Sequence, residues 1–199
     1  MKFYKFISVI LHPIVIPTLG VLIYFILIPN RINSYQKFLI LGLIFVITYL
    51  IPLFVLSILK KLGFIKSYQV ATIKERKIPL SIMILIFYFL GNTFFEIPFL
   101  RDLGILFFAT SFGLVIVYVF FIFKLKTSLH LLSIGIASGF FLLLSALYTI
   151  SFLPIILTLI LVSGILASSR LYLKAHSPKE VYFGFFLGFL CPFMVNLML

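Results

Sequence analysis

The sequence predicts an all-α protein that forms a polytopic transmembrane helical bundle of six or seven spans. Hydrophobic residues make up 64% of its 199 residues and charged residues 10%, whereas a soluble domain is about half apolar and about a quarter charged. The apolar residues occur in runs of roughly 20, the number that an α-helix needs to cross about 30 Å of hydrocarbon. Runs such as 107–123 do not alternate between apolar and polar residues, which excludes a transmembrane β-barrel.

The first apolar segment follows Lys2 and Lys5, an arrangement that is also found at the start of a signal peptide. This segment is long and no small-residue cleavage site interrupts it, so we expect it to remain in the protein as a membrane anchor. His12 lies in this segment with Pro13 and Pro17, and we interpret the three residues as a bend in the span.

Six more apolar segments follow, and the sixth of the seven is short, so the number of spans is six or seven. The single cysteine, Cys191, lies in the last segment, so no intrachain disulfide can form. No repeat or long linker divides the chain, and we expect residues 1–199 to form a single integral membrane domain. The predicted spans are 6–29, 38–59, 79–99, 103–123, 129–150, 153–168 and 181–198.

The net charge of +12 is distributed unequally between the two membrane faces that these spans predict. We call the face with more basic residues the richer face and the other the poorer face. The positive-inside rule places the richer face, and with it the amino terminus, in the cytoplasm. Topology and the bilayer thus explain most of the basic excess, and no nucleic-acid partner is expected. The poorer face carries Arg31, Lys37 and Arg101. The richer face carries Lys2, Lys5, Lys60, Lys61, Lys66, Lys74, Arg76, Lys77, Lys124, Lys126, Arg170, Lys174 and Lys179.

Three polar segments emerge on the richer face, because two spans separate each from the next. They lie at 60–78, 124–128 and 169–180. The last segment places an arginine, a histidine and a carboxylate within a few positions, although the chain has only three histidines and four acidic residues. The candidate site residues in and beside these segments are Lys74, Arg76, Ser128, His130, Ser169, Arg170, His176 and Glu180.

These side chains together have the chemistry of a phosphoryl-transfer site. Arginine matches two phosphate oxygens with its planar fork, and lysine adds a compact charge. One histidine can attack phosphorus while another protonates the departing oxygen. Glu180 lies four residues after His176, which places both on one face of a helix, where the carboxylate can fix the tautomer of the ring.

The three segments resemble the motifs of the type 2 phosphatidic acid phosphatase family, over about residues 74–190. The third motif of that family is Ser-Arg, five residues, His, three residues, Asp. The chain matches it at Ser169, Arg170 and His176, with Glu180 in place of the Asp. A helix with small residues follows, as in the family, with Val181, Gly184 and Gly188 at the matching positions.

The other two motifs match less closely, so the resemblance is to a degenerate, membrane-embedded member. The second motif, Pro-Ser-Gly-His, is met at Ser128 and His130 only. The first motif has Lys, six residues, then Arg-Pro, and Lys74 and Arg76 are the best substitutes for its basic residues. The resemblance implies that His176 is the nucleophile, Glu180 its orienting partner and His130 the general acid. It also implies the phosphate ligands Lys74, Arg76, Ser128, Ser169 and Arg170, with no metal or other cofactor.

Several of these residues have alternative structural explanations. The segment 177–180 has the pattern of a capping box with proline at the first helical position, so Glu180 could cap the last helix. Ser128 or Thr127 could cap the fifth span. The lysines of the loops are topology determinants. Neither topology nor capping requires the imidazoles of His130 and His176.

Three functions remain open at this point. The first is a phosphatase that hydrolyses a phosphomonoester or pyrophosphate on a lipid head group through a phosphohistidine, in the bacterial inner (cytoplasmic) membrane. The second is a non-catalytic protein that binds or transports an anionic lipid. The third is a metal site built from His130, His176 and Glu180, which the surrounding cations disfavour. Family members usually have the site outside the cytoplasm, whereas the charge distribution of this chain favours the cytoplasmic side.

Overall fold

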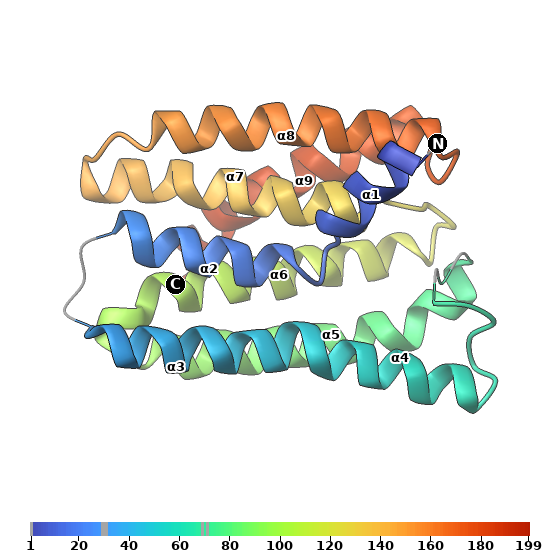
Figure 1. Cartoon of the computed structure of the whole chain (residues 1–199), viewed down its shortest axis with the longest axis horizontal. Coiled ribbons are helices and arrows are strands. Elements are labelled where there is room, and N and C mark those ends of the chain that lie inside the picture. Colours follow the sequence, from blue (N-terminus) through green and yellow to red (C-terminus); the bar gives the residue numbers. More distant parts are fainter. Residues whose placement is uncertain (1, 29–31, 69, 71) are drawn as a thin grey trace.

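The computed structural model describes residues 2–28, 32–68, 70 and 72–199, and the regular structure in these ranges is helical. The helices lie side by side along the long axis of the molecule (Figure 1), so the predicted all-α class is confirmed. They are α1 (Lys2–Ile10), α2 (Ile16–Leu27), α3 (Ser34–Phe45), a π-helical turn (Val46–Leu50), α4 (Ile51–Lys61), α5 (Ile73–Phe95), a 3-10 turn (Pro98–Leu100), α6 (Arg101–Phe120), α7 (Leu129–Tyr148), α8 (Leu153–Tyr172) and α9 (Pro178–Met198).

Six helical stretches of the described chain are long and apolar enough to cross a membrane, which confirms a polytopic integral membrane bundle. The helix α2 is apolar but has only 12 residues. The six stretches are Ser34–Lys61, Ile73–Phe95, Pro98–Phe120, Leu129–Tyr148, Leu153–Tyr172 and Pro178–Met198.

The first predicted span, 6–29, is broken into two helices. The helix α1 ends at Ile10 and α2 begins at Ile16, and the turn between them contains His12 and Pro13. Proline has no N–H for an intrahelical hydrogen bond, which explains the break. Residue 29 and Arg31, which the sequence assigns to the end of this span and to the poorer face, lie outside the described residues.

Several helices extend further into polar sequence than the sequence predicts, and two of them carry residues of the predicted site. The helix α5 begins at Ile73 instead of residue 79, because Thr72 and Glu75 form a complete capping box. The helix α8 continues to Tyr172 instead of residue 168. Hydropathy marks the limit of the hydrocarbon and not the end of a helix. Arg76 and Arg170 consequently lie on helices and not in loops.

The helices α7 and α9 approach each other closely along a line of glycines. A Cβ atom at Gly188 would lie 2.2 Å from the carbonyl oxygen of Leu132, and one at Gly135 would lie 2.3 Å from that of Phe185. Small residues of this kind let helix backbones touch in membrane proteins. At the end of this seam the N–H of Ser128 donates to the carbonyl oxygen of Glu180, at 3.2 Å, so the first turns of both helices are fixed to each other.

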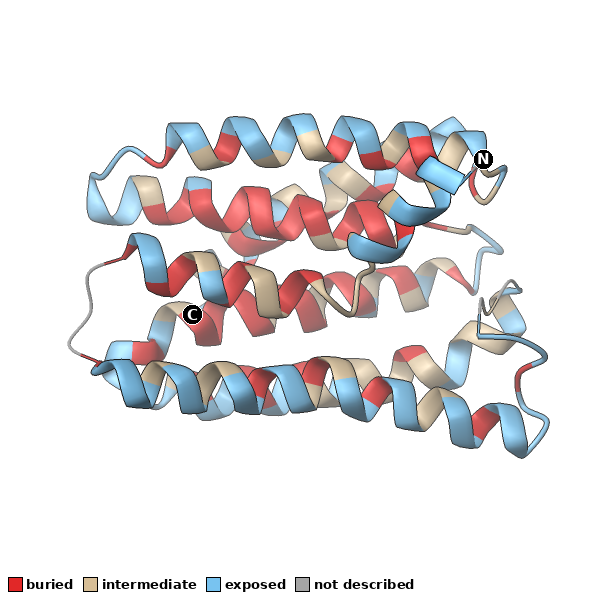
Figure 2. Ribbon diagram, in the orientation of Figure 1, coloured by how far each residue is buried: buried red, intermediate tan, exposed pale blue. Residues whose placement is uncertain are grey.

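The amino terminus and the connections α4–α5, α6–α7 and α8–α9 lie at the same end of the bundle (Figure 1), which we call the basic end. This agrees with the placement of thirteen basic residues on one face. At the opposite end, Asp102 accepts hydrogen bonds from the hydroxyls of Tyr24, at 2.9 Å, and Tyr148, at 2.7 Å. These two bonds join α2, α6 and α7. Buried residues concentrate on α6 and α7, whereas α3 is mostly exposed (Figure 2).

Candidate functional site

A histidine and a carboxylate form the centre of the site, at the start of α9. Nδ1 of His176 lies 2.5 Å from Oε2 of Glu180, and the two residues are four positions apart. The side chain of His176 is 2% exposed and that of Glu180 is 24% exposed. The Nδ1–H of the neutral ring therefore donates to the carboxylate, and Nε2 keeps its lone pair.

Burial and the surrounding cations determine the charge of this ring. Burial, together with the charges of Arg76, Arg170 and Lys126, lowers the pKa of His176 to about 4, although the hydrogen bond with Glu180 acts in the opposite direction. The imidazole is consequently neutral at pH 7. A neutral imidazole with a free Nε2 is the form that can act as a nucleophile.

The helix α9 begins in a way that leaves the Glu180 carboxylate available to His176. Ser177 accepts a hydrogen bond from the N–H of Glu180, at 3.4 Å, and Pro178 occupies the first turn. In α5 and α3 the side chains of Glu75 and Gln36 accept a hydrogen bond from the backbone N–H of the N-cap residue, which completes a capping box. Glu180 instead bonds to His176. Half of the predicted capping box is therefore present, and the carboxylate serves the histidine.

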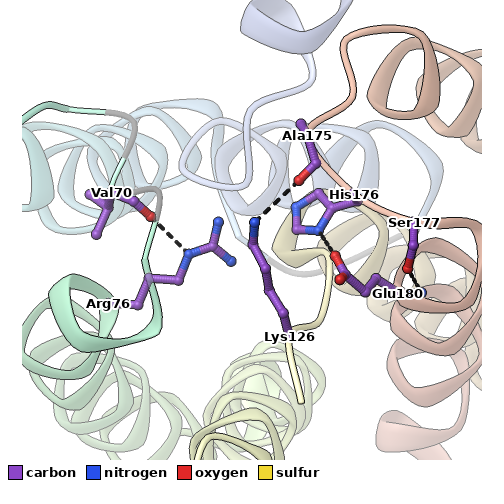
Figure 3. Close-up of polar contacts among 7 residues, drawn as sticks. All are labelled: Val70, Arg76, Lys126, Ala175, His176, Ser177 and Glu180. Carbon is purple, nitrogen blue, oxygen red and sulfur yellow. Dashed lines mark hydrogen bonds and ion pairs between the residues drawn. The ribbon is translucent and has the colours of Figure 1, made fainter. Parts of the chain in front are cut away.

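Three cationic side chains face the His176 ring from separate helices and loops. Arg76 from α5 and Lys126 from the α6–α7 loop lie on the side of the ring away from Glu180 (Figure 3). The Nε of Arg76 donates to the carbonyl oxygen of Val70, at 2.8 Å, and Nζ of Lys126 donates to that of Ala175, at 3.3 Å. Burial and the charge of Arg76 lower the pKa of Lys126.

Arg170 is the third cation of the site, in the last turns of α8. Its Nη1 donates to Oγ of Ser8 on α1, at 2.6 Å, and its buried Nε has no hydrogen-bond partner in the described chain. The terminal nitrogens of Arg76 likewise make no hydrogen bond among the described residues. A buried donor without a partner is costly. The two guanidinium groups are therefore ready to bind an anion.

His130 lies in the first turn of α7 and is 9% exposed. Its Nε2 lies 3.2 Å from the carbonyl oxygen of Ser8 and 3.5 Å from the Oγ of the same residue. The ring packs edge to face against that of His12, with 5.1 Å between ring centroids. All three histidines of the chain thus gather at the basic end.

A cavity of about 180 Å³ connects these residues to the interior of the bundle. Its polar end is lined by His12, Arg76, His130, Arg170 and His176. From there it follows α5 as far as Phe87, a depth of roughly 16 Å for eleven residues at about 1.5 Å each. The deeper lining is mostly apolar and comprises Pro52, Val55, Leu56, Leu80, Met83, Phe87, Leu114, Leu132 and Ile136. Thr110 and Ser133 also line it, and their hydroxyls donate to carbonyl oxygens of their own helices.

Not every residue of the sequence-predicted site joins this cluster. Lys74 is exposed and does not line the cavity, because two positions on a helix point in nearly opposite directions and Arg76 faces inward. Ser169 is fully buried and donates its hydroxyl to the carbonyl oxygen of Ile165, at 2.8 Å. Neither side chain is therefore in position to bind a phosphoryl group.

Ser128 occupies the N-cap position that its capping pattern predicts, but without the capping hydrogen bond. It is the N-cap residue of α7 but makes no side-chain capping bond, and its buried Oγ has no partner in the described chain. It does not line the cavity. Ser128 is held against α9 by its backbone, next to the site but outside it.

The sequence did not identify Ser8, His12 or Lys126 as site residues. Ser8 is an ordinary serine in an apolar segment, so nothing in the sequence marks it. His12 lies near two prolines, and the three residues together were already explained as a bend in the first span. Lys126 was indistinguishable from the topology-determining lysines around it. The rarity of histidine was the one signal available, and it applies to His12 as much as to the other two.

The described residues contain no group of three or more His, Cys, Asp or Glu side chains that could hold a metal ion. No protein-family model, no curated protein and no solved structure matches the chain.

Proposed function

We propose that the protein is a membrane-embedded lipid-phosphate phosphatase that works through a phosphohistidine on residue 176. One observation carries the proposal. The His176–Glu180 pair lies among three cations at the polar end of a cavity whose deeper lining is mostly apolar. An anionic head group and an apolar chain are the two parts of a lipid phosphate, and the cavity has a region suited to each.

The first step of the reaction uses the free nitrogen of the histidine. Nε2 of His176 attacks phosphorus, the bond from phosphorus to the lipid oxygen breaks, and its electron pair passes to that oxygen. Arg76, Arg170 and Lys126 neutralise the charge of the phosphoryl oxygens. Glu180 stabilises the positive charge that develops on the ring, through the Nδ1–H bond.

The second step releases phosphate. Water attacks the phosphohistidine, the P–N bond breaks, and its electron pair returns to Nε2. The sum of the two steps is hydrolysis of a phosphomonoester or of the terminal bond of a pyrophosphate. The three sequence segments that resemble the type 2 phosphatidic acid phosphatase motifs contribute His176, Glu180, Arg170, Arg76 and His130 to this one cluster, which supports a degenerate relationship to that family.

The proposal includes a location. We propose the bacterial cytoplasmic membrane, with the basic end of the bundle in the cytoplasm according to the positive-inside rule. The site would then meet the head groups of the inner leaflet. The phosphoryl group would be held at the boundary while the lipid chain remains in apolar surroundings.

The decisive experiment is to trap the intermediate. Purified protein is incubated with a labelled lipid phosphate, such as phosphatidic acid or a polyprenyl pyrophosphate, and quenched rapidly at alkaline pH. We expect an acid-labile phosphohistidine on residue 176 that is absent from His176→Asn. Release of phosphate should not be affected by a chelator. Glu180→Gln should lower turnover while α9 keeps its cap, because the Ser177 hydroxyl accepts from a backbone N–H.

Two outcomes would change this conclusion. If the wild-type protein releases phosphate from none of the candidate lipids but binds vanadate, the non-catalytic alternative, binding or transport of an anionic lipid, is correct. If turnover is lost on addition of a chelator and restored by a metal, the phosphohistidine mechanism is wrong.

A further inference from the structure

The third histidine of the cavity has no role in the mechanism above. His12 lies in the turn between α1 and α2, far in sequence from the three segments that resemble the phosphatase motifs. It lines the cavity together with its neighbours Pro13 and Ile14. Its ring packs against that of His130.

The backbone partners of the two rings determine which nitrogen of each carries the proton. A carbonyl oxygen can only accept, so Nε2 of His130, 3.2 Å from the carbonyl of Ser8, is protonated and donates to α1. A backbone N–H can only donate, so Nδ1 of His12, which is 3.3 Å from the N–H of Ile14, is the acceptor. The proton of a neutral His12 therefore resides on Nε2.

The two histidines thus differ in what they can offer to a ligand. The N–H of His130 is already bonded to Ser8, the residue whose hydroxyl also accepts from Arg170. The N–H of His12 has no acceptor among the described residues. Of the two, His12 has the free donor.

His12 lines the same cavity as Arg76, Arg170 and His176, in which the phosphoryl group and its leaving oxygen would be bound. Phosphoryl transfer proceeds roughly in line, so the leaving oxygen is on the far side of phosphorus from Nε2 of His176. That oxygen carries the lipid chain and must lie between the two guanidinium groups and the apolar lining. Pro13 and Ile14, which follow His12 directly, are apolar and also line the cavity, so the polar and apolar linings meet at this turn.

We propose that His12 is a catalytic residue that donates a hydrogen bond from Nε2–H to the leaving oxygen, and that His130 is a positioning residue that holds α1 in place. This inference rests on the proposed function. When the P–O bond breaks, its electron pair goes to the oxygen, the His12 hydrogen bond stabilises the developing alkoxide, and a water molecule protonates it. The hydroxide that this leaves is consumed when the phosphohistidine is hydrolysed. His12 remains neutral throughout.

The test compares two substitutions of His12 on two substrates. His12→Gln keeps an N–H donor, whereas His12→Phe keeps a ring of similar shape and removes the donor. The substrates are an alkyl phosphate, whose leaving oxygen needs stabilisation, and 4-nitrophenyl phosphate, whose leaving oxygen does not. We expect kcat/KM of His12→Phe for the alkyl phosphate to fall by about 100-fold or more, as when a single oxyanion donor is removed. The fall for 4-nitrophenyl phosphate should be less than about 10-fold, because little negative charge needs stabilising there.

The controls separate this inference from the function on which it rests. His12→Gln should recover most of the alkyl phosphate rate, and His12→Phe should still form the phosphohistidine from 4-nitrophenyl phosphate. Equal losses on both substrates, no loss on either, or equal rates for the Gln and Phe variants would each overturn the role of His12. If the wild-type protein hydrolyses neither substrate and forms no phosphohistidine, the proposed function itself fails, and the inference fails with it.

Discussion

The imidazole of His176 combines two properties that rarely occur together. It is buried and close to three cations, which keeps it neutral, and it is bonded to a carboxylate, which can stabilise the charge that it gains on attack. In water the carboxylate alone would favour the charged ring. The site therefore has the electrostatic balance of a nucleophile only as long as solvent is kept out of it.

This balance predicts a dependence of stability on pH. Because the folded-state pKa of His176 is about 4 and the ordinary value is 6.5, the fold favours the neutral ring. The contribution to stability is complete above about pH 6.5 and is lost as the pH falls towards about 4. Since one pKa unit corresponds to about 1.4 kcal/mol, the difference between 6.5 and about 4 corresponds to at most about 3–4 kcal/mol.

The measurement is thermal unfolding in detergent between pH 7.5 and 4.5, for the wild-type protein and His176→Asn. Asparagine does not titrate, so the wild-type melting temperature should fall more on acidification than that of the variant. Parallel curves would show that His176 is not held neutral by the fold.

At the residue scale the sequence was informative where a side chain was rare and had no structural explanation. His176, Glu180, Arg170, Arg76 and His130 lie at one end of one cavity or directly beside it. The sequence could not show which of two neighbouring residues faces the cavity, because that depends on the rotation of the helix. Lys74 and Arg76 are chemically similar and two positions apart, and only the start of α5 at Ile73 determines which of them faces inward.

The close pair of helices α7 and α9 is the element that positions the site. The glycine seam fixes the start of α9, with Glu180, against the start of α7, with His130. The other side of the cavity is formed by α5, which contributes Arg76. His176 and Glu180 are thus supported by a backbone contact, which allows little adjustment.

The seam leads to a prediction with a control inside the same chain. Gly188→Ala places a methyl group 2.2 Å from the carbonyl of Leu132, whereas Gly164→Ala on α8 meets nothing within 4 Å. We expect Gly188→Ala to destabilise the protein by about 1–3 kcal/mol, the usual cost of overpacking. Gly164→Ala should leave stability equal or raise it by up to about 1 kcal/mol, because alanine is the better helix former.

Melting temperatures of the two variants in the same detergent measure this difference. If Gly188→Ala is as stable as Gly164→Ala, the two backbones do not touch. The sequence indicated small residues in α9 but not the helix against which they pack. The glycines of α9 contact the backbone carbonyls of Leu132 and Ser128, and a backbone carbonyl leaves no mark in the sequence.

At the scale of the whole molecule, the arrangement of the spans was predictable and their ends were not. The three polar segments could be placed on one face because an even number of spans separates each from the next. The spans themselves follow from hydropathy alone. Proline explains the break between α1 and α2, whereas the insertion of Ser8 and His12 into the site depends on tertiary contacts with α7 and α8. No periodicity within the first segment encodes those contacts.

The orientation of the bundle in the membrane can be tested by labelling cysteines at its two ends. In a Cys191→Ala background, Leu125→Cys reports on the basic end and Tyr35→Cys on the opposite end, and both side chains are exposed. If the basic end is cytoplasmic, a membrane-impermeant maleimide should label Tyr35→Cys in intact cells and Leu125→Cys only after permeabilisation. The reverse pattern would place the site outside the cytoplasm.

The position of α4 affects how a lipid could reach the cavity. Pro52, Val55 and Leu56 of this helix line the cavity, whereas Phe54 points the other way and is 67% exposed. On this side the apolar interior is separated from the surrounding lipid by the thickness of a single helix. A chain that enters here exchanges one hydrocarbon environment for another, so its hydrophobic transfer free energy is close to zero and the barrier is the displacement of side chains on α4.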